Sequence, residues 1–510
     1  MRSEEKTNVR NSVSRMLFVG LSILIQIGWL CLLVIGLNRH SAWISLASSL
    51  LAAILVLHIY VSRKNAAFKM PWIILLLLLP PLGVMLYSMF GSAGATAAVR
   101  KRYRKVQEEF APLYARPDDA LRAVESRDPA AANHMRYLRD YAGCPVFLDT
   151  AAEYYGDTMQ AFLAQLEAME QAEHFIFMEY HAIEEAKAFS MLRDVLARKA
   201  AQGVEVRIFY DDVGSIGFIN LDFIKRMKEI GIECRAFNPV MPFLNIFMNH
   251  RDHRKITVVD GKIAFTGGYN LADEYFNMTH PYGEWKDTGV KLTGAAVRSL
   301  TLMFLEMWNC DKHTDTDITK YLPESTAEGE GFVQPYADTP LDDEYVGENV
   351  YLNLAGYAKH RLWITTPYLI ISDEMTRALT LAAKRGVDVR IITPGIPDKK
   401  VIYQVTRSYY AQLAVHGIRI YEYTPGFMHA KQMLCDANAA VVGTINMDYR
   451  SLYHHFENGV LLWECPAISD IADDFEAMFR ESAEVTEKYR SSPKVMRLGQ
   501  ALLRLLAPLL

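Results

Sequence analysis

Two motifs of the same composition, His-x-Lys-x4-Asp, lie far apart in this chain of 510 residues. Their six residues are His253, Lys255, Asp260, His429, Lys431 and Asp436. In a strand, residues i and i+2 point to the same face, so each histidine projects beside its lysine. Two such pairs facing each other would attract an anion with a highly charged transition state, such as a phosphodiester. One imidazole can attack phosphorus while the other protonates the leaving oxygen.

Further polar residues repeat at the same offset as the motifs. Asn270 and Asn446 follow the two motifs, and we expect them to hold the non-bridging oxygens together with the lysines as charge grows there. Asp260 and Asp436 lie at odd spacings from the histidines. We expect these aspartates to fix local structure rather than touch the substrate.

A metal site is the first alternative for a pair of histidines with nearby carboxylates. The lysine beside each histidine disfavours a bound cation, and the chain has no HxH or HExxH spacing. We therefore expect neither a metal nor another cofactor. A lone histidine could be an ordinary core residue, but the duplication of the whole set argues against that.

The elements that must position these residues also occur twice. Runs rich in Val and Ile, several of which begin after a glycine, alternate with helical stretches, a pattern typical of buried parallel strands. The runs are 175–180, 203–210, 231–237, 362–368, 386–392 and 417–423. We predict an α/β fold of two similar sandwich domains, 141–330 and 331–485, related by a pseudo-twofold axis. The acidic, turn-rich stretch 311–344 is expected to be a solvated linker between them.

The first hundred residues are far more apolar than the rest. Segments 16–37, 42–62 and 70–99 contain no Asp, Glu, Lys or Arg, and each is long enough to cross ~30 Å of hydrocarbon. A cleaved signal peptide does not explain three such runs. We expect residues 1–105 to form a helical membrane anchor with two or three transmembrane helices, kinked at Pro80-Pro81. The Lys and Arg counts of the flanks nearly balance, which leaves the orientation open.

Composition and the remaining segments limit the partners. The 54 Lys and Arg against 59 Asp and Glu give a net charge of −5, so no basic excess favours nucleic acid. The six cysteines are scattered, which argues against a disulfide scaffold. We expect an amphipathic linker at 106–140, an amphipathic tail at 486–510, a lipid bilayer as partner and no obligate protein partner.

The doubled motif with its trailing Gly-x-x-Asn resembles the phospholipase D superfamily, and more narrowly the bacterial cardiolipin synthases. The stretches that carry the resemblance are 267–275, 285–287, 397–400, 407–410, 421–431 and 446–451. The resemblance implies a multi-pass protein of the bacterial cell membrane. It also implies transfer of a phosphatidyl group from one phosphatidylglycerol to another through a phosphatidyl-histidine, with release of glycerol. A membrane-bound hydrolytic phospholipase D is the alternative; a tethered nuclease or a scaffold fits less well.

The same resemblance implies roles for individual residues. It makes His253 the nucleophile and His429 the general acid and base. It also places an acidic residue downstream of each motif to orient the histidine. We therefore expect Asp287 to orient His253 and Glu457 to orient His429.

Overall fold

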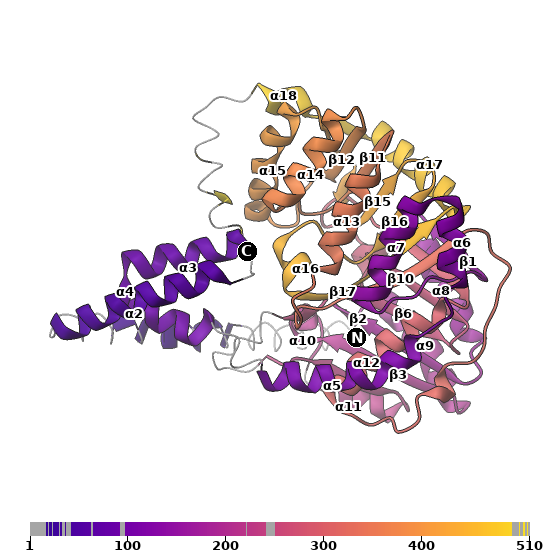
Figure 1. Cartoon of the computed structure of the whole chain (residues 1–510). Coiled ribbons are helices and arrows are strands. Elements are labelled where there is room, and N and C mark those ends of the chain that lie inside the picture. The colour runs from indigo at the N-terminus through magenta and orange to yellow at the C-terminus, as the bar shows by residue number, and fades with distance from the viewer. Residues whose placement is uncertain are drawn as a thin grey trace.

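The computed structural model describes residues 42–62, 65–91, 97–220, 222–240 and 250–491, with isolated positions between 17 and 36 and at 499, 503, 504 and 507. Two helix-covered sheets form one body, from which a group of N-terminal helices projects (Figure 1). The predicted apolar run 16–37 is described at separate helical positions from 17 to 36, whereas the predicted tail is described beyond 491 only at 499, 503, 504 and 507.

The first sheet has seven strands in the order β1-β9-β7-β6-β2-β3-β4. These are β1 (Thr150–Tyr155), β2 (Phe175–Tyr180), β3 (Glu205–Asp211), β4 (Glu233–Phe237), β6 (Lys255–Val259), β7 (Ile263–Gly267) and β9 (Gly289–Gly294). The parallel prediction is confirmed for β2, β3 and β4, which are linked through helices α9 (Lys187–Ala201) and α11 (Phe223–Glu229). Strand β6, which carries Lys255 of the first motif, pairs antiparallel to both β2 and β7. A tight turn joins β6 to β7, and such a turn can join only antiparallel neighbours.

The second sheet repeats this pairing in the order β10-β17-β16-β15-β11-β12-β13-β18. Its strands are β10 (Phe332–Asp338), β11 (Arg361–Thr365), β12 (Asp388–Pro394), β13 (Arg419–Tyr423), β15 (Gln432–Cys435), β16 (Ala439–Gly443), β17 (His455–Trp463) and β18 (Ser482–Glu484). Helices α13 (Val346–Tyr357), α14 (Asp373–Lys384), α15 (Lys400–Val415) and α17 (Ala467–Arg480) accompany these strands. Strands β15-β11-β12-β13 correspond to β6-β2-β3-β4, so the predicted repeat is present.

The stretch 311–344 is only partly the solvated linker that we expected. Strand β10 belongs to the second sheet and pairs with β17 along seven residues. Asp315 is buried, and its two carboxylate oxygens accept hydrogen bonds from Arg207 at 2.7 and 2.9 Å. This part of the chain therefore ties the two halves together.

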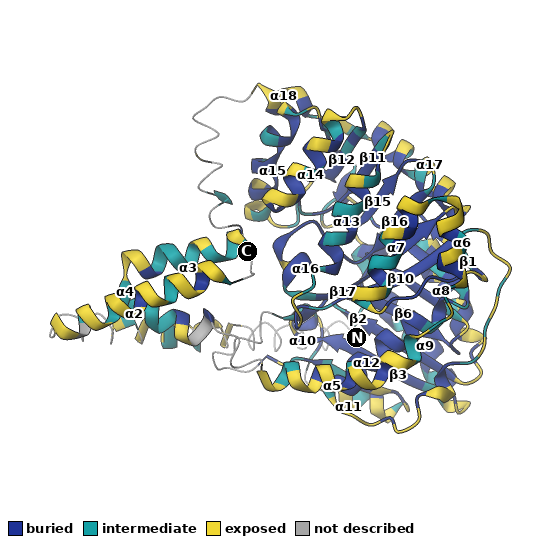
Figure 2. Cartoon of the chain, in the orientation of Figure 1, coloured by how far each residue is buried: buried dark blue, intermediate teal, exposed yellow. Residues whose placement is uncertain are grey.

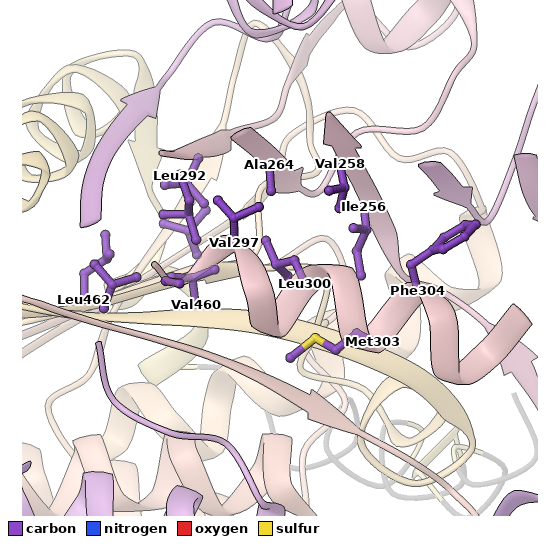
Figure 3. Close-up of a cluster of buried hydrophobic side chains, with 14 of the residues drawn as sticks. Ile256, Val258, Ala264, Leu292, Val297, Leu300, Met303, Phe304, Val460 and Leu462 are labelled. Carbon is purple, nitrogen blue, oxygen red and sulfur yellow. The ribbon is translucent and has the colours of Figure 1, made fainter. Parts of the chain in front are cut away.

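Helix α12 (Val297–Asp311) fills the space between the two sheets. Every residue from Ser299 to Cys310 is buried, as for a helix that is covered on all sides. Its Val297, Leu300 and Phe304 lie among side chains of both halves, including Ile256 from β6 and Val460 from β17 (Figure 3). The shared core holds the two halves, and hence their motifs, in a fixed relation.

The N-terminal helices α2 (Ala42–Val61), α3 (Ala66–Leu78) and α4 (Pro80–Leu86) pack against one another around Ala52, Ile59 and Leu76. We predicted a kink at Pro80-Pro81; the structure has a complete break there, because helix α3 ends at Leu78 and Pro80 starts α4. Many of their apolar side chains are exposed, whereas the sheets are buried (Figure 2). Across the described part of the chain, no helix is both long enough and apolar enough to span a membrane.

The segment between these helices and the sheets is helical. Helix α5 (Ala97–Tyr114) buries Tyr103, Val106 and Phe110 against α12 and its surroundings. Helices α6 (Asp119–Arg127) and α7 (Pro129–Ala142) place their apolar faces on the second half instead. The predicted amphipathic linker thus contacts both halves, and α5 begins before residue 105 as part of the folded body.

Candidate active site

Each motif histidine is placed by a short strand that pairs with the other half. Strand β5 (Arg251–Asp252) runs parallel to the start of β17, and the His253 backbone N–H donates to Phe456 O at 2.9 Å. The next residue on β17 is Glu457. Both of its carboxylate oxygens lie 2.9 Å from His253 Nδ1.

The second motif is placed in the reciprocal way. Strand β14 (Gly426–Met428) runs parallel to β8 (Glu284–Lys286) of the first half, and the His429 N–H donates to Lys286 O at 2.7 Å. The residue after Lys286 is Asp287, whose Oδ2 lies 2.5 Å from His429 Nδ1. Reciprocal exchange of this kind is what a pseudo-twofold axis produces.

The predicted pairing of carboxylates with histidines is therefore wrong. We expected Asp287 beside His253 and Glu457 beside His429, within each half. The structure crosses them, because β5 and β14 carry each histidine onto the opposite half before its motif strand begins. Each half is incomplete without the other.

A cavity of about 530 Å³ opens onto both histidines. Its walls come from both halves and include His181, Asn270, Tyr275, Trp285, Tyr368, Asn446, Asp448 and His455. Asn270 Oδ1 accepts from the Ala182 N–H and its amide donates to the Tyr275 hydroxyl, whereas the buried Asn446 Oδ1 has no hydrogen-bond partner within the described part of the chain. The two predicted asparagines thus reach the cavity, with Asn446 the freer of the two.

The motif lysines are buried behind the histidines. Lys255 Nζ donates to the His253 carbonyl at 2.5 Å, and Lys431 Nζ donates to the His429 carbonyl and lies 2.6 Å from His429 Nδ1. Among the described residues, neither lysine lines the cavity. Their positive charges therefore act on the site from behind the histidines.

Burial and these charges set the protonation of the site. Burial and Lys431 lower the pKa of His429 to about 3, and burial and Lys255 hold the pKa of His253 well below its usual value. Burial lowers the pKa of Lys255 to about 7 and that of Lys431 to about 8. Both imidazoles are therefore neutral near pH 7 until an anion enters and favours a proton on one of them.

The carboxylates fix the tautomer of the histidines. Burial raises the pKa of Glu457, while Lys255 and the Thr444 hydroxyl, 2.5 Å from Glu457 Oε2, oppose that rise by stabilising the ionised form. When Glu457 is ionised, it accepts a hydrogen bond from the Nδ1–H of His253, and the opposite nitrogen, Nε2, has a free lone pair. The geometry thus prepares His253 for attack through Nε2.

The motif aspartates lie away from the reacting atoms. Asp260 accepts hydrogen bonds from the backbone N–H groups of residues 173–175, and Asp436 accepts from those of residues 359–361. Both aspartates sit at positive φ, 51° and 53°, at the end of a motif strand. Each carboxylate therefore ties its motif hairpin to the strand beside it.

Aromatic and imidazole rings near the histidines were missed by the sequence reasoning. The rings of His181 and His455 lie 4.9 and 5.4 Å from that of His253. The His429 ring is instead surrounded by Trp285, Tyr275 and Phe427 at 5.0, 5.2 and 5.7 Å. A usable signal existed: His455 and Trp285 each precede a candidate carboxylate by two residues, which puts them on its face of the strand.

Comparison with known proteins gives the site a context. The family model described as cardiolipin synthase, PLD-like domain matches residues 166–284 and 351–479, and that described as phospholipase D-nuclease N-terminal matches 50–92. A cardiolipin synthase of Geobacillus kaustophilus is 34% identical over 89% of this chain and 91% of its own length. An uncharacterized protein of Streptococcus mutans is 39% identical over 89% of this chain and 99% of its own.

Among solved structures, the phosphatidylserine synthase of Haemophilus influenzae aligns with a TM-score of 0.55 at 14% identity. The alignment covers 74% of this chain and 99% of that one. This likeness supports the same fold for the paired α/β halves.

Proposed function

Since this chain belongs to the cardiolipin synthases of the phospholipase D superfamily, we propose that it transfers a phosphatidyl group from one phosphatidylglycerol to another and releases glycerol. The observation that carries the proposal is the reciprocal pair His253–Glu457 and His429–Asp287 at one cavity. Two imidazoles, each oriented by the other half, provide one nucleophile and one acid for the same phosphorus.

We assign the attack to His253. Its Nε2 forms a bond to the phosphorus of the first lipid, the bond from phosphorus to the glycerol oxygen breaks, and His429 gives that oxygen a proton. Three aromatic rings around His429 favour a positively charged imidazole, whereas His253 has two neutral imidazoles beside it. The surroundings therefore suit His429 to the protonated role.

The second step reverses the first with a new alcohol. The terminal hydroxyl of a second phosphatidylglycerol gives its proton to His429, and its oxygen attacks the phosphorus as the bond to His253 breaks. Lys255 and Lys431 stabilise the charge on the non-bridging oxygens, and Asn446 lies in the cavity wall beside them. Both histidines return to their starting state.

We also propose that the N-terminal segment holds the enzyme in the bacterial cell membrane. Exposed side chains on α2 and α3 include Leu50, Ile54, Leu57 and Leu77, an apolar surface that lipid would cover. At the start of α3, the Phe68 ring packs 5.4 Å from Tyr449, which lines the cavity. Lipid held by these helices would lie close to the cavity.

Product analysis tests the reaction. Purified full-length protein in detergent, given phosphatidylglycerol alone, should yield cardiolipin and glycerol by mass spectrometry, and a His253→Asn control should yield neither. Phosphatidic acid as the main product would mean that water is the acceptor and would overturn the transfer reaction.

A vesicle flotation assay tests the anchor. A variant that begins at Ala97 keeps α5, whose Tyr103 and Phe110 are part of the core. It should lose most vesicle binding yet still turn over detergent-solubilised lipid. Unchanged vesicle binding would place the membrane contact elsewhere.

A further inference from the structure

Three side chains of the first half-site have the composition of a transition-metal site. His455 and Glu457 lie two residues apart on β17, and His253 is bonded to Glu457 through Nδ1. Within the described residues, one nitrogen of each histidine and one oxygen of Glu457 lie within 4.8 Å of one another. Small side-chain rotations would bring these atoms around a single ion.

The environment of the His455 side chain is a second, independent observation in favour of a bound ion. Its side chain is only 10% exposed, and among the described residues neither ring nitrogen has a hydrogen-bond partner. Its Nδ1 lies 3.6 Å from Glu457 Oε1. Buried polar atoms are normally satisfied, so an imidazole left unpaired beside a carboxylate indicates a missing ligand.

We propose that one divalent transition-metal ion of the zinc class binds to His253, His455 and Glu457 and inhibits the enzyme. Imidazole nitrogens with a single carboxylate suit zinc, whose bonds to nitrogen are ~2.0–2.1 Å, whereas magnesium and calcium prefer oxygen ligands. The charge of Lys255 opposes a cation here and Glu457 offsets it. The ion therefore binds less tightly than at a structural zinc site.

Inhibition follows because the ion binds to Nδ1 of His253, and this part of the inference rests on the proposed function. The ion takes the place of the proton that His253 Nδ1 shares with Glu457, and that proton leaves to solvent. A metal on Nδ1 withdraws electrons from Nε2, which becomes a poorer nucleophile while the cavity stays open. Zinc should therefore lower kcat with little change in KM.

The other half-site provides the contrast. The position of His455 is taken there by Trp285, whose ring lies 5.0 Å from that of His429 and offers no metal ligand. One ion per chain is therefore the expected stoichiometry.

Cobalt titration of the full-length protein in detergent, after metal removal with EDTA, tests binding without turnover. Cobalt should give the visible absorption of an imidazole-bound ion at one per chain, and zinc should displace it. His455→Asn should weaken binding by at least tenfold, since even loss of an outer partner costs ~10–100-fold in metal affinity. His253→Asn, which we expect to be inactive, should weaken it similarly, so the conclusion does not depend on the fold of one variant.

His454→Asn is the matched control, because it removes the adjacent imidazole on the opposite face of the chain; its cobalt affinity should equal wild type. Equal affinity in His455→Asn and wild type, or no bound cobalt in wild type, would overturn the site. Cobalt binding without any cardiolipin from the metal-free enzyme would instead contradict the proposed function alone. Zinc binding with unchanged kcat would overturn the inhibition.

Discussion

The two half-sites share a backbone plan and differ in what surrounds the histidine. Each histidine follows a short strand paired to the other half and meets a carboxylate there. Beyond that carboxylate, His253 meets the imidazoles of His181 and His455, and His429 meets three aromatic rings. A duplicated scaffold thus places two identical groups, and unlike neighbours make one suited to attack and the other to carry a proton.

The largest expected effect comes from removing either histidine. His253→Ala and His429→Ala should each lower cardiolipin synthesis by at least about 10³-fold, or ~4 kcal/mol, because the two act as one unit. Initial rates from labelled phosphatidylglycerol give the measurement. A variant that kept more than about a tenth of the wild-type rate would exclude its histidine from the chemistry.

Loss of a motif lysine should be the next most severe change. The pH dependence of the rate should distinguish the two half-sites. Lys431→Met and Lys255→Met should each slow turnover by roughly 10²–10³-fold, since a positive charge close to the transition state is lost. Lys431 lies 2.6 Å from His429 Nδ1 and lowers the pKa of His429, so its removal raises that pKa. The acid stays protonated to higher pH, and the alkaline limb of the pH–rate profile of Lys431→Met should move upward.

Loss of a carboxylate should shift the alkaline limb of the pH–rate profile in the opposite direction, and only in the half-site of His429. Asp287 raises the pKa of His429, so Asp287→Asn lowers that pKa and the acid loses its proton at lower pH. The alkaline limb should move downward, with a loss on the order of 10²-fold in rate. Glu457→Gln should lose a similar factor through the wrong tautomer of the nucleophile and leave the alkaline limb in place. If Glu457→Gln moved that limb and Asp287→Asn did not, the two histidines would exchange roles.

The smallest effect concerns how each carboxylate is held. The Thr444 hydroxyl donates a hydrogen bond to Glu457 at 2.5 Å. Gly268, directly after β7, is the corresponding residue of the first half. A Cβ at Gly268 would lie 2.0 Å from Asp287 Oδ1, so no side chain fits there. Thr444→Val should lower kcat by about fivefold to tenfold, near 1 kcal/mol for one hydrogen bond. Thr444→Ser keeps the hydroxyl and should restore most of the rate. Equal rates for Val and Ser would show that the hydroxyl does not position Glu457.

The repeat was predictable because its signals are local. The motif spacing, the Val- and Ile-rich runs and the Pro80 break each depend on neighbouring residues, and the structure has the corresponding strands and helices. The crossed carboxylates depend on β5 and β14, strands of two and three residues, too short to leave a pattern in the sequence. Apart from Phe427, which precedes His429 by two residues, the rings around the two histidines come from distant segments that only the fold brings together.

The most direct test of the account is to locate the covalent intermediate. Wild-type enzyme mixed with labelled phosphatidylglycerol and quenched in denaturant within the first turnover should carry one phosphatidyl group per chain. Peptide mass spectrometry should place it on the peptide that contains His253. A phosphatidyl group on the His429 peptide would contradict the assignment of the two half-sites, and cardiolipin formed without any adduct would contradict the two-step mechanism itself.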